Sequence, residues 1–383
     1  MPKNYFFIIA GKKFVLSVPP HVENSQDLAT NGYFIKQGNE TLVVGLGDKE
    51  VALPDFGNSE ITAWYAEKFR IFVDNQLGQV PARIHLIKDS PYAKLSSPCD
   101  LTNFPFVPWT TTLNESIIIE NATICPDSIQ SGGDHFKLHN LYSRDHCNTV
   151  KESLKVFNKI SDIFSKHSYP GKMEGLLGSD RTPNWENLGA SLREVLELSL
   201  SGSGLVSMQA CGIEQQKPEL FNETFSMDEL CLRWYQLAAF MPAVHAIHET
   251  AGNSSMPYRF AKKTYTNWVK RALQRRIKLA PYIYSQMYLS YQDGEHSGSP
   301  LIRPLFYEFP DDLNLNNYFV IWKQFMLGDS ILVNPVVDPE IRLVEAFFPR
   351  EPWYELWSGL KIEGLSKMQK TEAIQAQIPA YIR

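Results

Sequence analysis

The sequence predicts an α/β fold of parallel β-strand and α-helix units, followed by a region made of strands alone. Two observations lead to this prediction. Short apolar runs alternate with longer stretches of helical periodicity up to about residue 325, which is the pattern of parallel βα units. After Gly328 the helical stretches stop while short apolar runs continue, which indicates a second region built only from sheet.

The composition is that of a globular protein with a large core. The chain has 383 residues, of which 44% are hydrophobic and 21% charged, so neither disorder nor a fibrous repeat fits. This length exceeds the ~250–300 residues of a single core, which favours one large domain and one smaller one. A net charge of −5 and a pI near 6.0 argue against a nucleic-acid partner. No run approaches the ~18 apolar residues of a membrane span, so none is expected.

The first half of the chain contains two apolar runs of strand length around one helical stripe. Residues 13–18 (KFVLSV) form the first run and residues 84–87 (IHLI) form the second. Between them, residues 59–73 carry apolar side chains at helical spacing, and Asn58 supplies a start signal. The order strand, helix, strand is the first of the predicted βα units.

Residues 91–134 interrupt this order with a long, loop-rich excursion. Cys99 and Cys125 lie toward its two ends. A connection of this length is uncommon inside a compact domain unless it serves a function or is tied down. We therefore expect a functional or disulfide-tied segment here.

The alternation of helical and apolar stretches continues through the second half. Pro281 predicts a kink in the last of the helices. Helical stretches cover residues 148–164 (running into a possible strand), 185–200, 227–240 and 260–291. Strands are expected at residues 176–177, 204–208, 243–247, 331–337, 344–348, 353–357 and 378–382.

Two carboxylates are candidate catalytic groups because each follows a predicted strand. Asp180 ends a strand-like segment and opens the helix over 185–200, and Asp89 follows the run at 84–87. In a (β/α) barrel this position is the catalytic face. Two carboxyl groups, one protonated and one ionised, are the minimum for glycoside hydrolysis. Spacing alone favours the alternative, in which Asp180 caps the helix or both groups are solvated loop carboxylates.

No metal or cofactor is expected. His245 and His248 are spaced as a metal pair could be, but no third ligand is evident in the sequence. None of the five cysteines lies in a C-x-x-C arrangement, so a zinc ribbon or thioredoxin motif is excluded. Phosphate-binding and dinucleotide-binding glycine motifs are absent from the sequence.

Five N-x-Ser/Thr triplets permit N-glycosylation and favour a lumenal protein. The apolar run near the N-terminus, residues 5–10, is too short for a signal peptide and is followed at once by the charged residues Lys12 and Lys13. The odd cysteine count leaves at least one cysteine outside any disulfide. The candidate acceptor residues are Asn39, Asn114, Asn121, Asn222 and Asn253.

Eight strings occur along the chain in an order that matches a known family. They are ALPDF (52–56), TICPDS (123–128), HNLY (139–142), ELCLRWYQLAAFMP (229–242), APYIY (280–284), RPLFYEFPDD (303–312), QFMLGDSILVNPV (324–336) and WYELWSG (353–359). Together they resemble glycoside hydrolase family 31, the α-glucosidases related to lysosomal acid α-glucosidase and sucrase-isomaltase. The resemblance covers nearly the whole chain.

This resemblance implies a fold and an organisation. The fold is a partial (β/α)8 TIM barrel, about strands 3–8, followed by the start of a C-terminal β-sandwich. The barrel part covers residues 1–328, with the disulfide-tied loop at 91–134, and the β-rich part covers 329–383. Residues 13–18 match the family's third strand, so we expect the middle of a larger protein and poor stability of the chain alone.

The resemblance also implies a chemistry and a compartment. The family reaction is retaining hydrolysis of terminal α-glucosidic bonds without a cofactor, so an α-glucoside or maltooligosaccharide is the implied ligand. The implied location is the secretory pathway, lysosomal or extracellular. The implied disulfides join Cys99 to Cys125 and Cys211 to Cys231, which leaves Cys147 outside both pairs.

The catalytic positions depart from the family pattern. The family nucleophile is the Asp of a W-I-D-M-N-E motif, and this chain has Lys88 or Ile87 there, depending on the anchoring proline. Only a one-residue shift places Asp89 at that position. Asp180 keeps the acid/base spacing, five residues before Trp185.

The sugar-binding positions depart as well. Gln209 stands where the family has the aspartate of D-x-C-G, and His245 begins the segment that replaces R-N-H. The resemblance therefore implies a family member with little or no α-glucosidase activity. Two alternatives stay open: a working glycosidase with Asp180 as acid and Asp89 as displaced nucleophile, and a non-catalytic sugar-binding or interaction pseudoenzyme.

Overall fold

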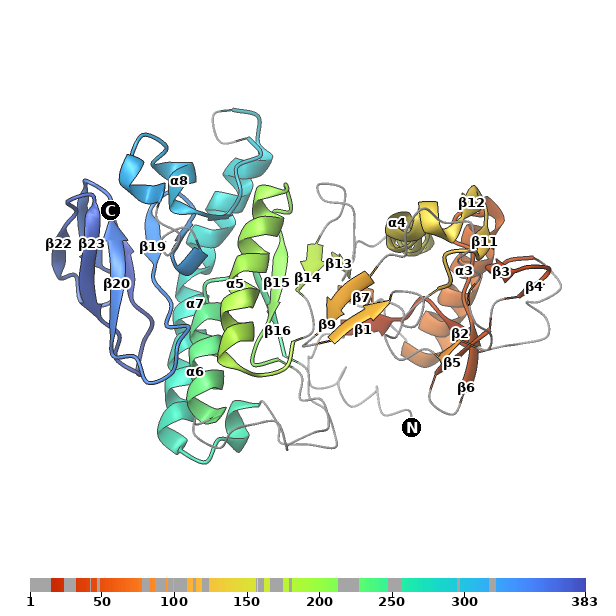
Figure 1. The fold of residues 1–383 in the computed structure, drawn as a ribbon, viewed down its shortest axis with the longest axis horizontal. Coiled ribbons are helices and arrows are strands. Elements are labelled where there is room, and N and C mark those ends of the chain that lie inside the picture. Colours follow the sequence, from red (N-terminus) through yellow and green to blue (C-terminus); the bar gives the residue numbers. More distant parts are fainter. Residues whose placement is uncertain are drawn as a thin grey trace. The chain divides into compact units, whose positions relative to one another are not determined.

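The structure is a computed structural model that divides into two compact units, Met1–Leu176 and Leu177–Arg383 (Figure 1). Each unit is described by itself. Among the described residues no helix has both the length and the apolar character needed to cross a membrane. The described residues are 15–23, 32–41, 43–46, 49–77, 83–86, 94–95, 99, 109–112, 115–118, 124–155, 157, 162–165, 175–178, 181–212, 227–246, 256–294, 297–316 and 322–383.

Parallel strands run through the first unit. β1 (Val15–Val18) and β13 (Asp162–Ser165) pair in parallel with β7 (Arg83–Leu86), and β13 also pairs in parallel with the beginning of β14 (Gly175–Leu177). The strands expected at 13–18, 84–87 and 176–177 are therefore confirmed over their described residues. The parallel pairing confirms the prediction of βα units, since parallel neighbours need a crossover between them.

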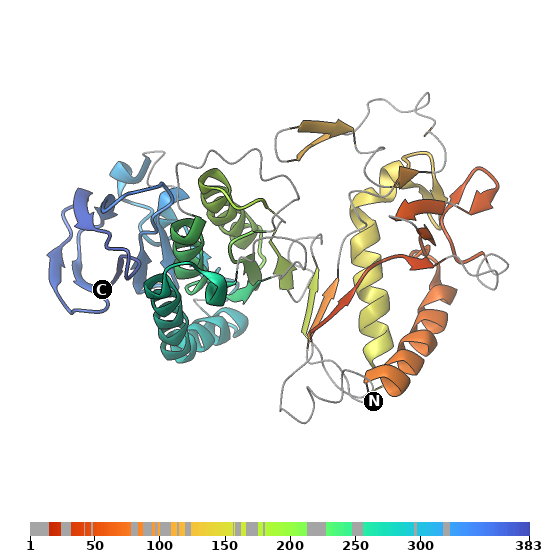
Figure 2. The same ribbon diagram turned by 90° about the horizontal axis from the view of Figure 1, so that it is seen from below.

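Two helices lie side by side in this unit, α3 (Ser59–Phe72) and α4 (His135–Lys155) (Figure 2). The Asn58 side chain accepts a hydrogen bond from the Glu60 backbone at 3.0 Å, which confirms the predicted start of α3. The prediction for α4 was wrong at its start, because the helix was expected to begin at residue 148; the possible strand into which it was expected to run is present as β13. The first turns of α4 carry polar side chains, so their buried face shows no apolar stripe.

Residues 91–134 hold more regular structure than the expected loop. β9 (Trp109–Thr112) and β10 (Glu115–Ile118) form a hairpin, and β11 (Ile129–Gln130) pairs with both β12 (Gly133–Asp134) and β3 (Lys36–Gln37). The Cys99–Cys125 disulfide ties the segment, as the resemblance implied. The remaining short elements of this unit are β2 (Val22–Glu23), β4 (Glu40–Thr41), β5 (Val43–Leu46), β6 (Lys49–Ala52), β8 (Lys94–Leu95) and η1 (Val73–Leu77).

The second unit begins with strands and helices in alternation. β15 (Val206–Gln209) pairs in parallel with β16 (Ala243–His245), and Gly178, just after β14, donates its backbone N–H to Ser207 at 2.7 Å. α5 (Trp185–Leu200) matches the predicted helix over its full length, and α6 (Met227–Ala238) and α7 (Lys263–Tyr291) confirm the other two. Pro281 lies inside α7.

The C-terminal part of this unit is rich in strands, as predicted. One sheet has the order β17-β18-β19-β24-β21-β22, and β20 pairs with β23. β17 and β18 precede residue 329, yet they pair into the same sheet as β19. The bounds are β17 (Ile302–Arg303), β18 (Phe325–Leu327), β19 (Ile331–Val333), β20 (Leu343–Phe348), β21 (Pro352–Glu355), β22 (Lys361–Glu363), β23 (Lys367–Glu372), β24 (Ala380–Ile382), α8 (Leu305–Glu308), η4 (Pro257–Arg259) and η5 (Leu313–Asn316).

The second disulfide joins Cys211, in the turn after β15, to Cys231 in α6, as the resemblance implied. Cys147 lies buried in α4 and outside both disulfides. The Cys211–Cys231 bridge fixes the carboxyl end of β15, where the candidate functional residues lie.

Candidate functional site

The carboxyl ends of β15 and β16 bring two of the predicted site residues together. Gln209 and His245 are register partners in the parallel ladder, and the Ala210 backbone N–H donates to the His245 carbonyl at 2.8 Å. Parallel strands in a barrel present their carboxyl ends at the catalytic face. Gln209 and His245 therefore share the edge at which a family site would lie.

Ser207 is a third member of this group that the sequence interpretation missed. Its hydroxyl lies 2.8 Å from Nδ1 of His245. Alternate residues of a strand face the same side, so Ser207 and Gln209 share one face of β15. That alternation was the available signal, because Ser207 lies two residues before a position already singled out.

The side-chain amide of Gln209 is buried without a hydrogen-bonding partner in the described part of the chain. The residue is 3% exposed, and neither its Nε2 nor its Oε1 atom is satisfied. Buried polar groups in proteins are nearly always paired, and an unmet one costs about 1–3 kcal/mol. Gln209 thus offers a donor and an acceptor to a polar ligand or a water molecule.

The segment before α5 is built by an N-cap and an ion pair. The Asn184 side chain accepts from the Asn187 backbone at 2.7 Å and caps the helix, so the alternative in which Asp180 is the cap is wrong. Arg181 Nη2 lies 3.3 Å from Glu194 Oε2, and the two side chains are 23% and 19% exposed. Glu194 is a carboxylate at this end of the sheet, but a guanidinium already engages it.

The turn after β15 touches this same segment. Gly212 has φ +66°, and a Cβ atom there would lie 2.4 Å from the Arg181 carbonyl oxygen. Only glycine combines this φ with so close an approach. The Gln209 turn and the segment that follows Asp180 are consequently fixed against each other.

The two candidate catalytic carboxylates lie outside the described residues. These are Asp180 and Asp89, and Lys88 and Ile87 are outside as well. β7 ends at Leu86, directly before these positions. The roles of Asp180 as acid and Asp89 as displaced nucleophile stay a prediction.

The glycosylation candidates fall into two groups. Asn39 is exposed in the turn between β3 and β4, where it is accessible to modification. The other four, Asn114, Asn121, Asn222 and Asn253, lie outside the described residues.

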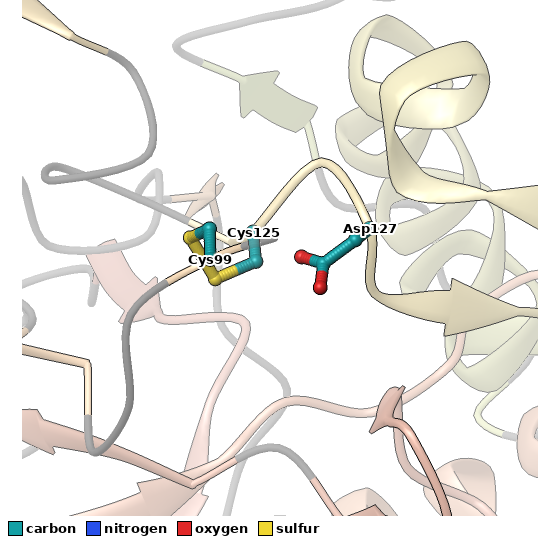
Figure 3. A group of neighbouring side chains, drawn as sticks. All are labelled: Cys99, Cys125 and Asp127. Atoms are coloured by element: carbon teal, nitrogen blue, oxygen red, sulfur yellow. A yellow bond between two sulfur atoms is a disulfide. The ribbon is translucent and has the colours of Figure 1, made fainter. Parts of the chain in front are cut away.

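One group of metal-ligating residue types gathers in the first unit, and it does not form a metal site. Cys99, Cys125 and Asp127 place their ligand atoms within 4.8 Å of one another (Figure 3). Both sulfur atoms are joined in the disulfide, whereas a metal binds the thiolate. Only the carboxylate of Asp127 remains as a ligand. The described residues contain no other cluster of three metal-ligating side chains.

Family models match almost the entire chain. The model described as "Glycosyl hydrolases family 31 TIM-barrel domain" matches residues 8–286, and "Glycosyl hydrolase family 31 C-terminal domain" matches residues 298–383. The two matches agree with a βα region followed by a strand-rich region.

Relatives of known name share about a quarter of the sequence. Lysosomal alpha-glucosidase of Bos taurus is 29% identical over 369 residues, which cover 90% of this chain and 36% of the relative. Intestinal sucrase-isomaltase of Homo sapiens is 26% identical over 355 residues, covering 90% of this chain and 18% of the relative. The chain thus spans about a third or less of the length of these relatives.

Solved structures share the fold at lower identity. A family 31 sulfoquinovosidase from E. rectale superposes with a TM-score of 0.75 at 20% identity, covering 100% of this chain and 52% of that one. A family 31 dextranase from Flavobacterium johnsoniae superposes with a TM-score of 0.76 at 17% identity, covering 99% of this chain and 44% of that one. At these identities the likeness concerns the fold alone.

Proposed function

Because the chain belongs to glycosyl hydrolase family 31, we propose that it is a member by descent with little or no α-glucosidase activity. The observation that carries this proposal is the residue at the nucleophile position, Lys88 or Ile87 in place of aspartate. Retaining hydrolysis needs a carboxylate that forms a glycosyl ester. Lysine cannot form that ester, and its positive charge opposes the developing oxocarbenium ion.

The substitutions at the strand ends support the same conclusion. Gln209 replaces a carboxylate with a neutral amide, and His245, bonded to Ser207, stands where the family has a cationic arginine. Charged groups aimed at the substrate are worth more in the transition state than in the ground state. Their loss removes stabilisation that the family reaction requires.

A sugar-binding role without turnover is the second candidate, and the unsatisfied amide of Gln209 favours it. A buried amide with both atoms free to bond is suited to the hydroxyl groups of a sugar. The names of the relatives point to α-glucosides or maltooligosaccharides as the ligand class. The proposed setting is the secretory pathway, lysosomal or extracellular, with Asn39 as an exposed glycan acceptor.

The proposed organisation follows the family. The first part of the chain forms a partial (β/α)8 barrel with its excursion at 91–134, and the last part forms the start of a β-sandwich. The boundary lies before β17 rather than at residue 328, because β17 and β18 pair into the same sheet as β19. The working-enzyme alternative assigns Asp180 as the acid and Asp89 as a displaced nucleophile. It rests on the five-residue spacing from Asp180 to Trp185.

An activity assay with an aryl α-glucoside tests the proposal. The chain is assayed at about pH 4.5 and about pH 6.5, beside Asp180→Asn and Asp89→Asn variants, because one carboxyl must be protonated and one ionised. We expect no turnover above the level of the variants. Turnover that both substitutions abolish would establish the working enzyme, and turnover that survives both would place the site elsewhere.

Calorimetric titration with glucose and maltose separates the second candidate from the first. Sugar binding is expected to weaken in Gln209→Ala and to be unchanged in Gln292→Ala, an exposed glutamine after α7. Absence of binding by the unmodified chain would remove the sugar-binding role.

A further inference from the structure

Three histidines lie on α4, and two of them are almost fully buried. His135 and His146 are each 2% exposed, and His139 is half-buried one turn after His135. α4 packs against α3, and His146 contacts Tyr65 of that helix. The proposed function uses none of these residues.

The first two histidines form a hydrogen-bonded chain with Gln130. His135 Nδ1 lies 3.0 Å from Gln130 Nε2, and His135 Nε2 lies 2.9 Å from His139 Nδ1. Only one proton fits between the two ring nitrogens, whichever tautomer is present. If both rings became charged, two N–H groups would face each other at this distance.

The third histidine has an apolar setting. The His146 ring stacks on Phe56 at 4.5 Å between centroids, and Tyr65 of α3 meets it edge-on at 6.2 Å. Within the described part of the chain, His146 Nε2 has no hydrogen-bond partner. A proton added there would place a charge in the core with nothing to solvate it.

The charged and titratable groups nearby have partners of their own. Asp55, beside Phe56, accepts from the backbone N–H groups of Ser131 at 2.6 Å and Gly57 at 3.2 Å. The phenol of Tyr142 donates to the Pro54 carbonyl at 3.0 Å. Other ion pairs of these elements are Asp134 with Lys137, Asp145 with Arg144, Glu152 with Lys155, and Arg70 of α3 with Glu67 and Asp74. Asp127 also has a partner.

We propose that this histidine cluster, His135, His139 and His146, makes the packing of α4 within the first unit depend on near-neutral pH. Mild acid protonates the rings in the open state and releases α4. This pH dependence does not require that the residues at the carboxyl ends of β15 and β16 hydrolyse a glycoside.

The direction of the effect follows from the two buried rings. Burial lowers the pKa of His146 to about 3, and burial together with the charge of His139 lowers the pKa of His135 to about 3. An exposed histidine has a pKa near 6.5. Below this pH the opened state therefore binds protons that the packed state does not bind. Packing is therefore fully stable above about pH 6.5 and weakens as pH falls toward 3.

Hydrogen exchange of the full chain tests this dependence. Between about pH 7.5 and about pH 4.5, the opening constant of α4, corrected for intrinsic exchange, should rise about 100-fold for each buried histidine released. Amides of α6, in the second unit, serve as the internal reference and should not follow. A constant opening of α4 over this range would overturn the proposal.

Two variants assign the effect to the rings. His146→Phe keeps an aromatic ring on Phe56, and His135→Gln keeps a hydrogen-bonding side chain beside Gln130 and His139. Each should remove about one proton from the pH dependence of α4 opening. An unchanged pH dependence in whichever of the two variants folds would contradict the assignment.

Discussion

Arg233 of α6 donates through Nη2 to the backbone carbonyl of Ala373 at 2.9 Å, across 140 positions of sequence. Nη1 donates to the next carbonyl, that of Ile374, at 3.1 Å. The side chain is 2% exposed, and burial lowers its pKa to about 10, so it stays charged at neutral pH. Within the second unit, one buried cation thus connects α6 to the segment after β23.

Replacing this cation should destabilise the second unit. Arg233→Met takes the Arg233 donor away from the buried Ala373 carbonyl and removes the bonds to the Ile374 and Ile341 carbonyls, which predicts a loss of about 3 kcal/mol in the free energy of unfolding. Lys361→Met is the control, since Lys361 pairs with Glu363 on an exposed strand. Urea unfolding followed by circular dichroism gives both values. Equal midpoints for the two variants would contradict the connection.

Asp55 should stabilise the first unit by joining two of its segments. Its carboxylate joins the loop before α3 to the turn at Ser131, and it is 5% exposed. Asp55→Asn keeps the shape but turns one acceptor into a donor that faces an N–H group, so we expect a loss of about 2 kcal/mol. Thermal unfolding measures the change beside Asp74→Asn, an exposed acid after α3. If Asp55→Asn is as stable as this control, the hydrogen bonds of the Asp55 carboxylate do not stabilise the unit.

Gly212 should tolerate no side chain. The Gly212→Ala substitution combines a positive φ with a clash at the Arg181 carbonyl, and we expect a loss of about 2 kcal/mol. Gly204→Ala is the matched control, because a Cβ atom there meets open space. Chemical unfolding of both variants decides the matter, and equal stability would show that the turn can shift without cost.

The Cys211–Cys231 disulfide should stabilise the second unit. It closes a loop with a sequence separation of 20, which predicts about 3 kcal/mol on the chain-entropy account. Cys231→Ala removes the bridge, and the loss is read from unfolding without reductant. Peptide mapping under non-reducing conditions must recover the Cys211–Cys231 pair from the unmodified chain. Failure to recover it would contradict the pairing.

Periodicity and caps predicted the helices whose buried faces are apolar. α5 agrees over its full length because its apolar stripe is continuous. The start of α4 was not predicted, because His135 and His146 are buried polar residues and a hydropathy pattern assigns such residues to the surface. His135 is buried beside Gln130 and His146 against Phe56 and Tyr65, and no local pattern contains these contacts.

Short strands on sheet edges were also missed. β23 has the sequence KMQKTE, in which three side chains are exposed, two are half-buried and only Thr371 is buried. The β9–β10 hairpin has the polar sequences WTTT and ESII. Pairing with a neighbour makes such segments strands, and that information lies elsewhere in the chain.

The family motifs located Gln209 and His245, but they did not indicate how these residues bond. The pairing of Ser207 with His245 and the unmet amide of Gln209 follow from the register of β15 and β16. That register depends on the whole sheet, so motif spacing alone could not supply it.

Trapping of a covalent glycosyl intermediate tests the central claim most directly, namely that no carboxylate serves as nucleophile. Retaining glycosidases pass through a glycosyl ester, so an activated, slowly released α-glucosyl donor should label a working enzyme. Intact-mass measurement after incubation should show the unmodified mass of the chain. An added glycosyl mass mapped to Asp89, and lost in Asp89→Asn, would contradict the account.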